Sequence, residues 1–158
     1  MELRRATAEE WAASREIRLR ALTEAPHTFC STLERELAFD DQQWRDRLAQ
    51  AATFLAWDHD SPVGTATGKV DPHEEGSREL VAMWVDPTYR RFGIAVALIN
   101  SVAEWARTDG ARAIALWVAE DNEPARSLYD KCGFGLTGER EDMRLGIDQL
   151  RMRKVLDG

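Results

Sequence analysis

The sequence is poor in cysteine and histidine and has no long apolar run, and each shortage excludes a class of protein. Its two cysteines, Cys30 and Cys132, lie far apart and match no metal-binding or redox spacing, which predicts free thiols in a reducing compartment. The three histidines form no ligand-like cluster, so we expect no metal site. No stretch approaches the roughly 18 apolar residues of a membrane span, and the charged residues Met1 to Glu10 lack a signal core. These features predict a cytoplasmic protein with no membrane partner.

Positive charge is also in short supply. The chain carries 21 Lys and Arg against 28 Asp and Glu, a formal net charge of −7. This balance disfavours broad binding of nucleic acid and weakly favours an amine-bearing partner. The 158 residues contain no internal repeat, low-complexity stretch or linker, and 44% of them are hydrophobic. We therefore expect a single domain over residues 1–158.

Capping residues and apolar spacing divide the chain into helices and strands. They predict strands at 2–6, 53–57, 63–70, 79–85 and 113–118, terminal strand segments at 134–137, 143–147 and 149–155, and helices that begin near Thr7, Asp40 or Asp41, Ile94 and Asn122. The irregular stretch 23–39 is expected to be a partly helical loop. The order β-α-α-β-β-β-α-β-α-β-β indicates an α+β (mixed α/β layer) fold with one central mixed sheet flanked by helices.

The strand at 79–85 is expected to lie in the middle of the sheet. Its two-residue period predicts that Glu79, Val81, Met83 and Val85 share one face. Together with the helix from Ile94 and the strand at 113–118, it forms a right-handed parallel unit.

An anion-binding turn is predicted between that strand and that helix. Gly93 allows a tight turn, and the helix start presents unpaired N–H groups and the positive end of the helix dipole. Arg90 and Arg91 add two permanent positive charges. A plain strand-to-helix connection explains the same residues equally well when the turn is considered alone.

Two stretches of the chain together resemble the GNAT superfamily of acetyl-CoA-dependent N-acetyltransferases. Residues 85–95, VDPTYRRFGIA, are similar to the family's V-x-P-x-x-R-x-x-G-x-[GA] segment, and residues 122–134, NEPARSLYDKCGF, to its N-x-x-A-x-x-L-Y-x-x-x-G-F helix. The element order fits a GNAT-like fold along the whole chain, although before residue 53 it matches only in general pattern. Arg91 and Phe92 depart from the family, which commonly has glycine and a basic residue there.

The resemblance implies acetyl-CoA as the acetyl donor, with no metal. Backbone groups of the central strand would pair with the pantetheine arm, the arginine-glycine turn would hold the pyrophosphate, and a helix-capping Asn122 would face the pantetheine. The implied cofactor-binding residues are Met83, Trp84, Val85, Arg90, Arg91, Phe92, Gly93, Ile94, Ala95, Asn122 and Tyr129.

The resemblance also suggests which residues carry out the reaction. Tyr129 is the candidate acid for the departing thiolate, with a core aromatic as the alternative, and a backbone N–H near Val85 is the candidate oxyanion donor. Glu79 is the candidate base, acting through water, with a surface glutamate at the strand edge as the alternative. A covalent route through Cys132 is disfavoured because no histidine lies near it in sequence.

The acceptor is less defined. Phe29, Cys30 and Trp44 are candidate substrate contacts, although the pattern favours a flap that covers the core. The acidic loop that contains Asp71, Glu74 and Glu75 mildly favours a small cationic amine, although surface solubility explains the same charges equally well. A protein N-terminus or lysine is an alternative acceptor, and a non-catalytic acyl-CoA-binding module is an alternative function.

Two further points concern fold and assembly. A doubly wound nucleotide-binding fold is disfavoured because no glycine-rich turn follows the first strand. A homodimer formed through the terminal strands would be ordinary for the predicted fold.

Overall fold

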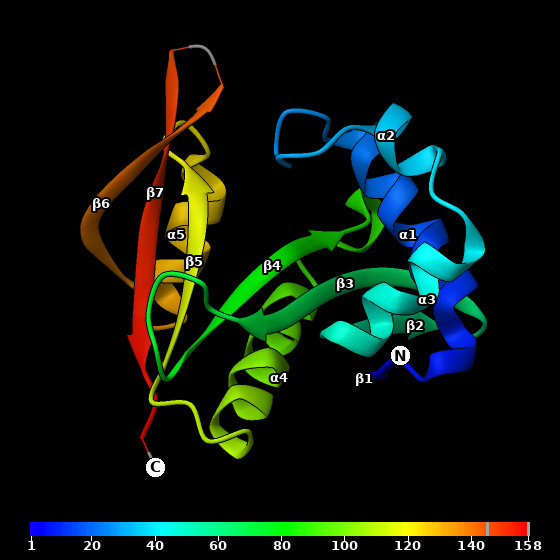
Figure 1. Cartoon of the computed structure of the whole chain (residues 1–158), viewed down its shortest axis with the longest axis horizontal. Coiled ribbons are helices and arrows are strands. Elements are labelled where there is room, and N and C mark those ends of the chain that lie inside the picture. Colours follow the sequence, from blue (N-terminus) through cyan, green and yellow to red (C-terminus); the bar gives the residue numbers. More distant parts are fainter. Residues whose placement is uncertain (145, 158) are drawn as a thin grey trace.

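A computed structural model describes residues 1–144 and 146–157. Its elements are β1 (Glu2–Arg5), a 3₁₀ turn (Ala8–Glu10), α1 (Trp11–Glu24), α2 (Leu33–Leu37), α3 (Asp41–Gln50), β2 (Ala52–Asp58), β3 (Ser61–Val70), β4 (Ser77–Val85), a 3₁₀ turn (Pro87–Tyr89), α4 (Ile94–Thr108), β5 (Ala113–Ala119), α5 (Glu123–Lys131), β6 (Gly135–Arg144) and β7 (Ile147–Val155). The predicted mixed α/β fold is confirmed (Figure 1), and α2 adds one helix to the predicted order, inside the stretch expected to be a partly helical loop. No helix among the described residues is both long and apolar enough to cross a membrane.

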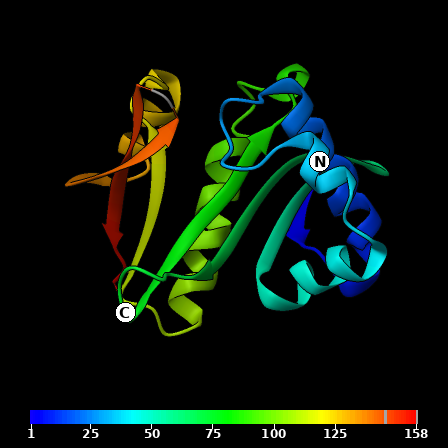
Figure 2. The same ribbon diagram turned by 45° about the horizontal axis from the view of Figure 1, so that its top comes forward.

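One seven-stranded sheet runs through the molecule in the order β1-β2-β3-β4-β5-β7-β6. Its pairs are antiparallel except for β4 and β5, which are parallel and connected by α4. The β4–β5 ladder joins Ser77–Glu79 to Ala113–Ala115 and then ends, because the two strands diverge. Figure 2 shows this divergence as a V with β4 on one arm and β5 on the other.

Helices cover both faces of the β1–β4 half of the sheet. On one face α4 buries Ile94, Leu98 and Val102 against Leu80 of β4 and Ile114 of β5. On the other face α1 buries side chains against β2 and β4 in a smaller cluster of Ile17, Ala21, Leu55, Trp57 and Trp84. The α4 face holds the larger core and extends to α5.

The prediction that Glu79, Val81, Met83 and Val85 share one face of β4 is wrong. Trp84 pairs with Thr65 and Val81 pairs with Thr67, so Ala82 and Met83 together oppose a single residue of β3. This extra residue is a β-bulge, and it reverses the alternation of side chains. Met83 and Val85 consequently pack into the α4 core, whereas Trp84 packs against α1.

The terminal strands differ from the prediction in their boundaries. The segments predicted at 134–137 and 143–147 are largely parts of one strand, β6, whose residues from Gly135 to Asp142 are exposed. An edge strand in water carries no alternating apolar signal, which is why the sequence does not predict a strand in the polar stretch between the two segments. Leu145, inside the predicted 143–147 segment, lies outside the described residues.

Candidate active site

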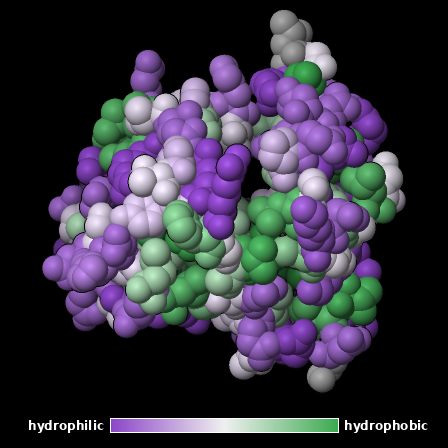
Figure 3. All heavy atoms as spheres, turned by 180° about the vertical axis from the view of Figure 1, so that it is seen from behind, coloured by the Kyte–Doolittle hydropathy of each residue, from purple (hydrophilic) through white to green (hydrophobic). Residues whose placement is uncertain are grey.

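A deep cleft opens where β4 and β5 diverge. Its volume is about 1430 Å³, above the roughly 300–1000 Å³ of ordinary small-molecule sites, so it has room for more than one ligand. Residues 80–85 of β4 line one side, and Trp117, Val118 and Ala119 of β5 line the other. Figure 3 shows a hollow between the two lobes of the molecule, with hydrophobic residues at its base and hydrophilic residues around it.

One edge of β4 lacks a strand partner along this cleft. The β3 ladder occupies the opposite edge as far as Val85, whereas among the described residues β5 pairs only with Ser77–Glu79. The bulge residue Ala82 has a φ of 56°, a left-handed conformation that costs energy in a non-glycine residue and is often found at functional sites. An extended ligand arm can pair with this free edge as an added strand does.

The turn before α4 forms one end of the cleft. Gly93 is left-handed, with a φ of 78°, and a Cβ atom placed on it would meet no atom within 4 Å from the described residues beyond its chain neighbours. The first turn of α4 lines the cleft beside Gly93, so its unpaired N–H groups are available to an anion. Arg91 also has a positive φ, 74°, at a position where the resembled family commonly has glycine.

Two predicted residues of this turn are placed differently from the rest. Arg90 lines the cleft, but its Nε donates to the carbonyl of Val85 at 3.0 Å and its guanidinium pairs with Glu24. Phe92 is 74% exposed and does not line the cleft. The structure brings the other cofactor-binding candidates to the cleft, namely Met83, Trp84, Val85, Arg91, Gly93, Ile94, Ala95, Asn122 and Tyr129.

Helix α5 contributes two of these side chains. Asn122 caps the helix, with its Oδ1 accepting from the N–H of Ala125 at 3.3 Å, so the cap and a place in the cleft coexist. Tyr129 is 9% exposed, and its ring meets Phe134 edge-on at 6.0 Å. Burial, reinforced by the neighbouring Cys132, raises the pKa of Tyr129 to about 12. The phenol therefore keeps its proton at neutral pH and can act as a donor.

Glu79 is a buried carboxylate at the narrow end of the V. Its residue is 5% exposed, it lines the cleft, and its Oε1 lies 3.4 Å from Lys69 Nζ. Cys132, by contrast, does not line the cleft, and burial raises the pKa of its thiol. A thiolate nucleophile is disfavoured at that position.

All three predicted substrate contacts line the cleft on the side opposite β5. The guanidinium of Arg18 lies over the ring of Phe29, with Arg18 Cζ 4.7 Å from the ring centre. Cys30 is exposed, with its Sγ 3.9 Å from Gln149 Oε1 across the cleft. Trp44 is only 2% exposed and packs edge-on against Phe39, so it serves the core as well as the cleft wall.

The sequence interpretation missed an ion triad on the same side. Glu36 of α2 is fully buried and accepts from Arg18 Nε at 2.9 Å, Arg18 Nη2 at 3.1 Å and Arg47 Nη1 at 2.8 Å. Burial alone would raise the pKa of Glu36, but the hydrogen bonds and charge of Arg18 and the charge of Arg47 outweigh it and hold the pKa at about 2. No sequence signal joins these residues, because three separate helices supply them.

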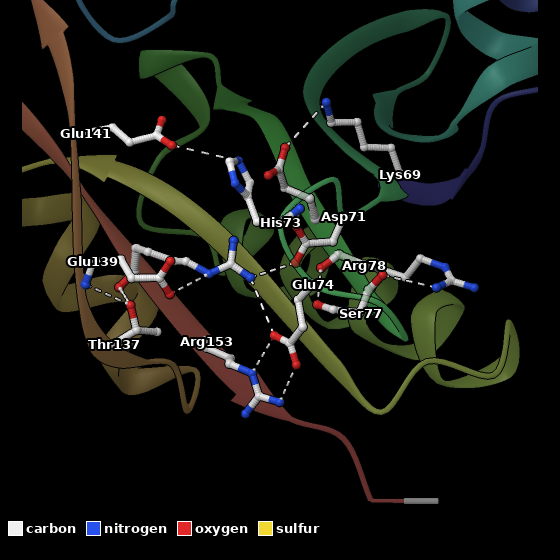
Figure 4. A network of polar contacts seen from close by, with 12 residues as sticks. Lys69, Asp71, His73, Glu74, Ser77, Arg78, Thr137, Glu139, Glu141 and Arg153 are labelled. Atoms are coloured by element: carbon white, nitrogen blue, oxygen red, sulfur yellow. Dashed lines mark hydrogen bonds and ion pairs between the residues drawn. The ribbon is translucent and has the colours of Figure 1, made fainter.

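The acidic loop is placed differently from the expectation that it borders the site. Asp71 is buried and pairs with Arg151 at 2.7 Å, and Glu74 pairs with Arg153 at 2.9 Å. Figure 4 shows Asp71 and Glu74 directed into this network, whereas His73 points toward Glu141. Asp71, Glu74 and Glu75 do not line the cleft, although His73 does. The loop therefore gives no support to a cationic acceptor.

The residues of the cleft fit a long ligand with an anionic end. The free β4 edge suits a thin arm that carries amide groups, and the glycine turn with its helix start suits a phosphate. Among residues 1–144 and 146–157, no group of three or more His, Cys, Asp or Glu residues is arranged to hold a metal ion. The site thus offers backbone groups, a phenol and a carboxylate as its reactive components.

Comparison with known proteins gives a family match over most of the chain. Residues 17–134 match the model of the Acetyltransferase (GNAT) family. The chain is 30% identical over 167 residues to the L-amino acid N-acetyltransferase AaaT of Escherichia coli (strain K12), covering 97% of this chain and 96% of that protein. It is 33% identical over 119 residues to a mycothiol acetyltransferase of Geodermatophilus obscurus, covering 73% of this chain but only 38% of that protein.

The fold also has solved counterparts. A GNAT-family acetyltransferase from Streptococcus pneumoniae superposes with a TM-score of 0.84 at 19% identity, covering 99% of both chains. The first two curated relatives are longer proteins, of which this chain spans 38% and 25%. The relatives named above differ in the acceptor that their names state, so the acceptor does not follow from similarity.

Proposed function

The chain belongs to the GNAT acetyltransferase family, and from that premise we propose that it transfers the acetyl group of acetyl-CoA to the primary amine of a small molecule. The amine attacks directly in a ternary complex, without a covalent acetyl-enzyme. The observation that carries this proposal is the β4–β5 ladder that ends after Glu79, beside a glycine turn at the start of α4. A free strand edge next to an anion-binding helix end suits a pantetheine arm followed by a pyrophosphate.

In this proposal backbone groups hold the donor. The turn from Arg90 to Ala95 binds the pyrophosphate, and the N–H groups of α4's first turn carry most of that contact because Arg90 is engaged by Glu24 and Val85. The free edge of β4 binds the arm, and Asn122 faces it from the start of α5. Acetyl-CoA supplies the activated thioester when bound.

Three groups of the chain then assist the transfer. A backbone N–H near the β4 bulge, at Met83 to Val85, stabilises the oxyanion that forms as the amine attacks the carbonyl. Glu79 takes up the ammonium proton through a water molecule, which leaves the amine neutral for attack. Tyr129 keeps its phenolic proton, since its pKa is raised to about 12, and donates it to the departing sulfur as the C–S bond breaks. The second proton of the attacking nitrogen then passes to the phenolate, which restores the phenol and leaves a neutral amide.

A contact across the cleft supports a small acceptor over a protein. Arg144 of β6 donates from Nη1 to the carbonyl of His27 at 3.1 Å and pairs through Nη2 with Asp121 at 2.8 Å. Cys30 and Gln149 approach each other across the same opening. A polypeptide acceptor would have to displace these contacts, whereas a small amine would not.

The test is thiol release from acetyl-CoA in the presence of a panel of small amines, with mass spectrometry of the products. We expect acetylated amine and stoichiometric thiol, and a lower kcat with Glu79→Gln at unchanged acetyl-CoA affinity. A protein that binds acetyl-CoA by calorimetry but releases no thiol with any amine would instead be a non-catalytic binding module.

A further inference from the structure

The charges that line the cleft are opposite in sign to those of the whole protein. The chain as a whole carries a net charge of −7, yet six basic and three acidic side chains line the cleft. Three of the basic residues, Arg18, Arg35 and Arg47, come from α1, α2 and α3, and the carboxylate of Glu36 pairs with Arg18 and Arg47. A surplus of positive charge on this side of the cleft favours an anionic group in the ligand.

The carboxylates that remain open to the cleft lie elsewhere. Glu79 projects from β4, with its Oε1 3.4 Å from Lys69 Nζ, and Glu141 projects from β6 and accepts from Gln149 of β7 at 3.3 Å. The part of the cleft away from the α4 turn therefore has two chemically distinct regions, one with a surplus of arginine and one that holds the carboxylates of Glu79 and Glu141. A ligand with an ammonium group and a carboxylate group matches both regions at once.

Arg18 is the best-organised cation of the arginine side. Glu36 accepts hydrogen bonds from Nε and Nη2 of Arg18 in a bidentate ion pair, and the Arg18 guanidinium lies over the ring of Phe29. Its Nη1 has no hydrogen-bond partner within residues 1–144 and 146–157, and that atom is not sealed from solvent. A fixed guanidinium with a spare N–H pair loses little entropy when it binds a carboxylate.

The burial of Glu36 indicates what the triad is for. A fully buried carboxylate is costly and gives little net stability even when paired, so its value lies in holding the arginines in one geometry. Arg47 shares the same carboxylate at 2.8 Å, which leaves the triad with a net positive charge beside the cleft. Thr53 and Thr67, whose hydroxyls lie 3.2 Å apart, line the cleft on neighbouring strands and add polar groups.

We propose that the acetyl acceptor is an amino acid or a similar small amino-carboxylate, and that Arg18 sets this specificity by binding its carboxylate. Glu36 is the positioning residue for Arg18. The amine then lies on the Glu79 side of the cleft, where the transfer proposed above takes place. This inference rests on the proposed acetyltransferase function and narrows its acceptor.

The first experiment compares each standard L-amino acid with its own carboxamide, which has the same side chain but no carboxylate. We expect kcat/KM for the best amino acids to exceed that for their carboxamides by about tenfold or more, the effect of a hydrogen bond to a charged group. The amine of a carboxamide is the less basic of the two, so more of it is neutral, and the comparison is biased against the proposal.

The second experiment removes the cation without stranding its buried partner. Arg18→Gln alone leaves Glu36 with one arginine, so the double variant Arg18→Gln/Glu36→Gln is used, with thermal melting to check that it folds. We expect it to abolish the preference by raising KM for the amino acid. The KM for acetyl-CoA and kcat/KM for the carboxamide should not change. Arg15→Gln removes a cation from the same helix outside the cleft and should behave as wild type.

The possible outcomes separate the two proposals. Acetylation of carboxamides as efficient as that of amino acids, or a double variant that keeps the preference, would overturn the role of Arg18 while leaving the acetyltransferase function intact. Absence of thiol release with every amine would overturn the proposed function and this inference with it.

Discussion

The two ends of the cleft are built in different ways. The α4 end uses short continuous stretches of chain, such as the turn at Gly93 and the cap at Asn122, and offers mainly backbone groups. The end near α1 is assembled from distant side chains: Arg18 meets Glu36 18 positions away, and Cys30 meets Gln149 119 positions away. An end made of backbone keeps its chemistry when side chains change, whereas an end made of side chains can be adapted to a new acceptor.

A change at Tyr129 should give the largest effect on turnover. Tyr129→Phe removes a proton donor, and we expect kcat to fall about 100-fold or more, with the affinity for acetyl-CoA unchanged. Because the pKa of Tyr129 is about 12, its deprotonation should cause no alkaline loss of wild-type activity at ordinary assay pH. Steady-state kinetics against pH make the measurement. An unchanged kcat would rule out the phenol as the donor.

Gly93→Val tests the backbone end and should lower acetyl-CoA affinity about 10-fold to 100-fold, by blocking N–H groups that bind charged oxygens. Calorimetry provides the measurement. Gly110→Val is the matched control, because Gly110 lies at the other end of α4 with a φ of 85° and has no protein atom near its missing Cβ. Both variants carry the same backbone strain, so equal affinity losses would contradict the pyrophosphate site.

Glu36→Gln tests the side-chain end through its stability. The pKa of Glu36 is about 2 in the folded protein and about 4.5 when unfolded, so its contribution is complete above pH 5 and is lost as pH falls toward 2. At neutral pH, the ionisation of Glu36 therefore favours the folded state over the unfolded state by about 3 kcal/mol relative to the protonated carboxyl.

Urea unfolding at a series of pH values measures this contribution. The acid limb of the stability curve should be shallower in Glu36→Gln, while acetyl-CoA affinity stays the same. Glu34→Gln, an exposed change on the same helix, should leave the limb as in wild type. Identical limbs in Glu36→Gln and wild type would show that the triad does not hold this carboxylate ionised.

Arg91→Gly should have the smallest effect and should act only at the backbone end. Arg91 is exposed with a φ of 74°, so glycine relieves strain worth about 1 kcal/mol but also removes a cation near the proposed pyrophosphate. We expect slightly higher thermal stability and a few-fold weaker acetyl-CoA binding. His59→Gly, with a φ of 57° in the turn between β2 and β3, should relieve strain without affecting binding. Lower stability of Arg91→Gly would contradict this account.

The same contrast explains how much the sequence could reveal. Helices α4 and α5 carry their own caps and apolar spacing, so their positions and the cleft residues upon them were predictable from local pattern. The β-bulge at Ala82 was not, because a period of two contains no signal for an inserted residue. The bulge redirected Val85 to the α4 core and left Glu79 on the other face.

Long-range ion pairs were the other feature beyond reach. Asp71 and Glu74 appeared as free acidic residues near the site, but Arg151 and Arg153 neutralise them from β7, about 80 positions along the chain. Glu36 appeared as one more charge in an irregular stretch. The packing of distant elements decides which charges cancel, and therefore which charged side chains remain free at the cleft.

The short β4–β5 ladder also has a mechanical meaning. Three residue pairs form the only strand-to-strand seam that the described residues provide between the two halves of the sheet, and a seam this short is the weakest line across it. A ligand that pairs with the β4 edge while contacting β5 and α5 bridges the gap above that seam. Such a ligand connects the two halves of the sheet as well as taking part in the reaction. Because it binds only the folded state, the melting temperature rises with the ligand concentration. The supply of acetyl donor would then govern how long this protein stays folded as well as how fast it works.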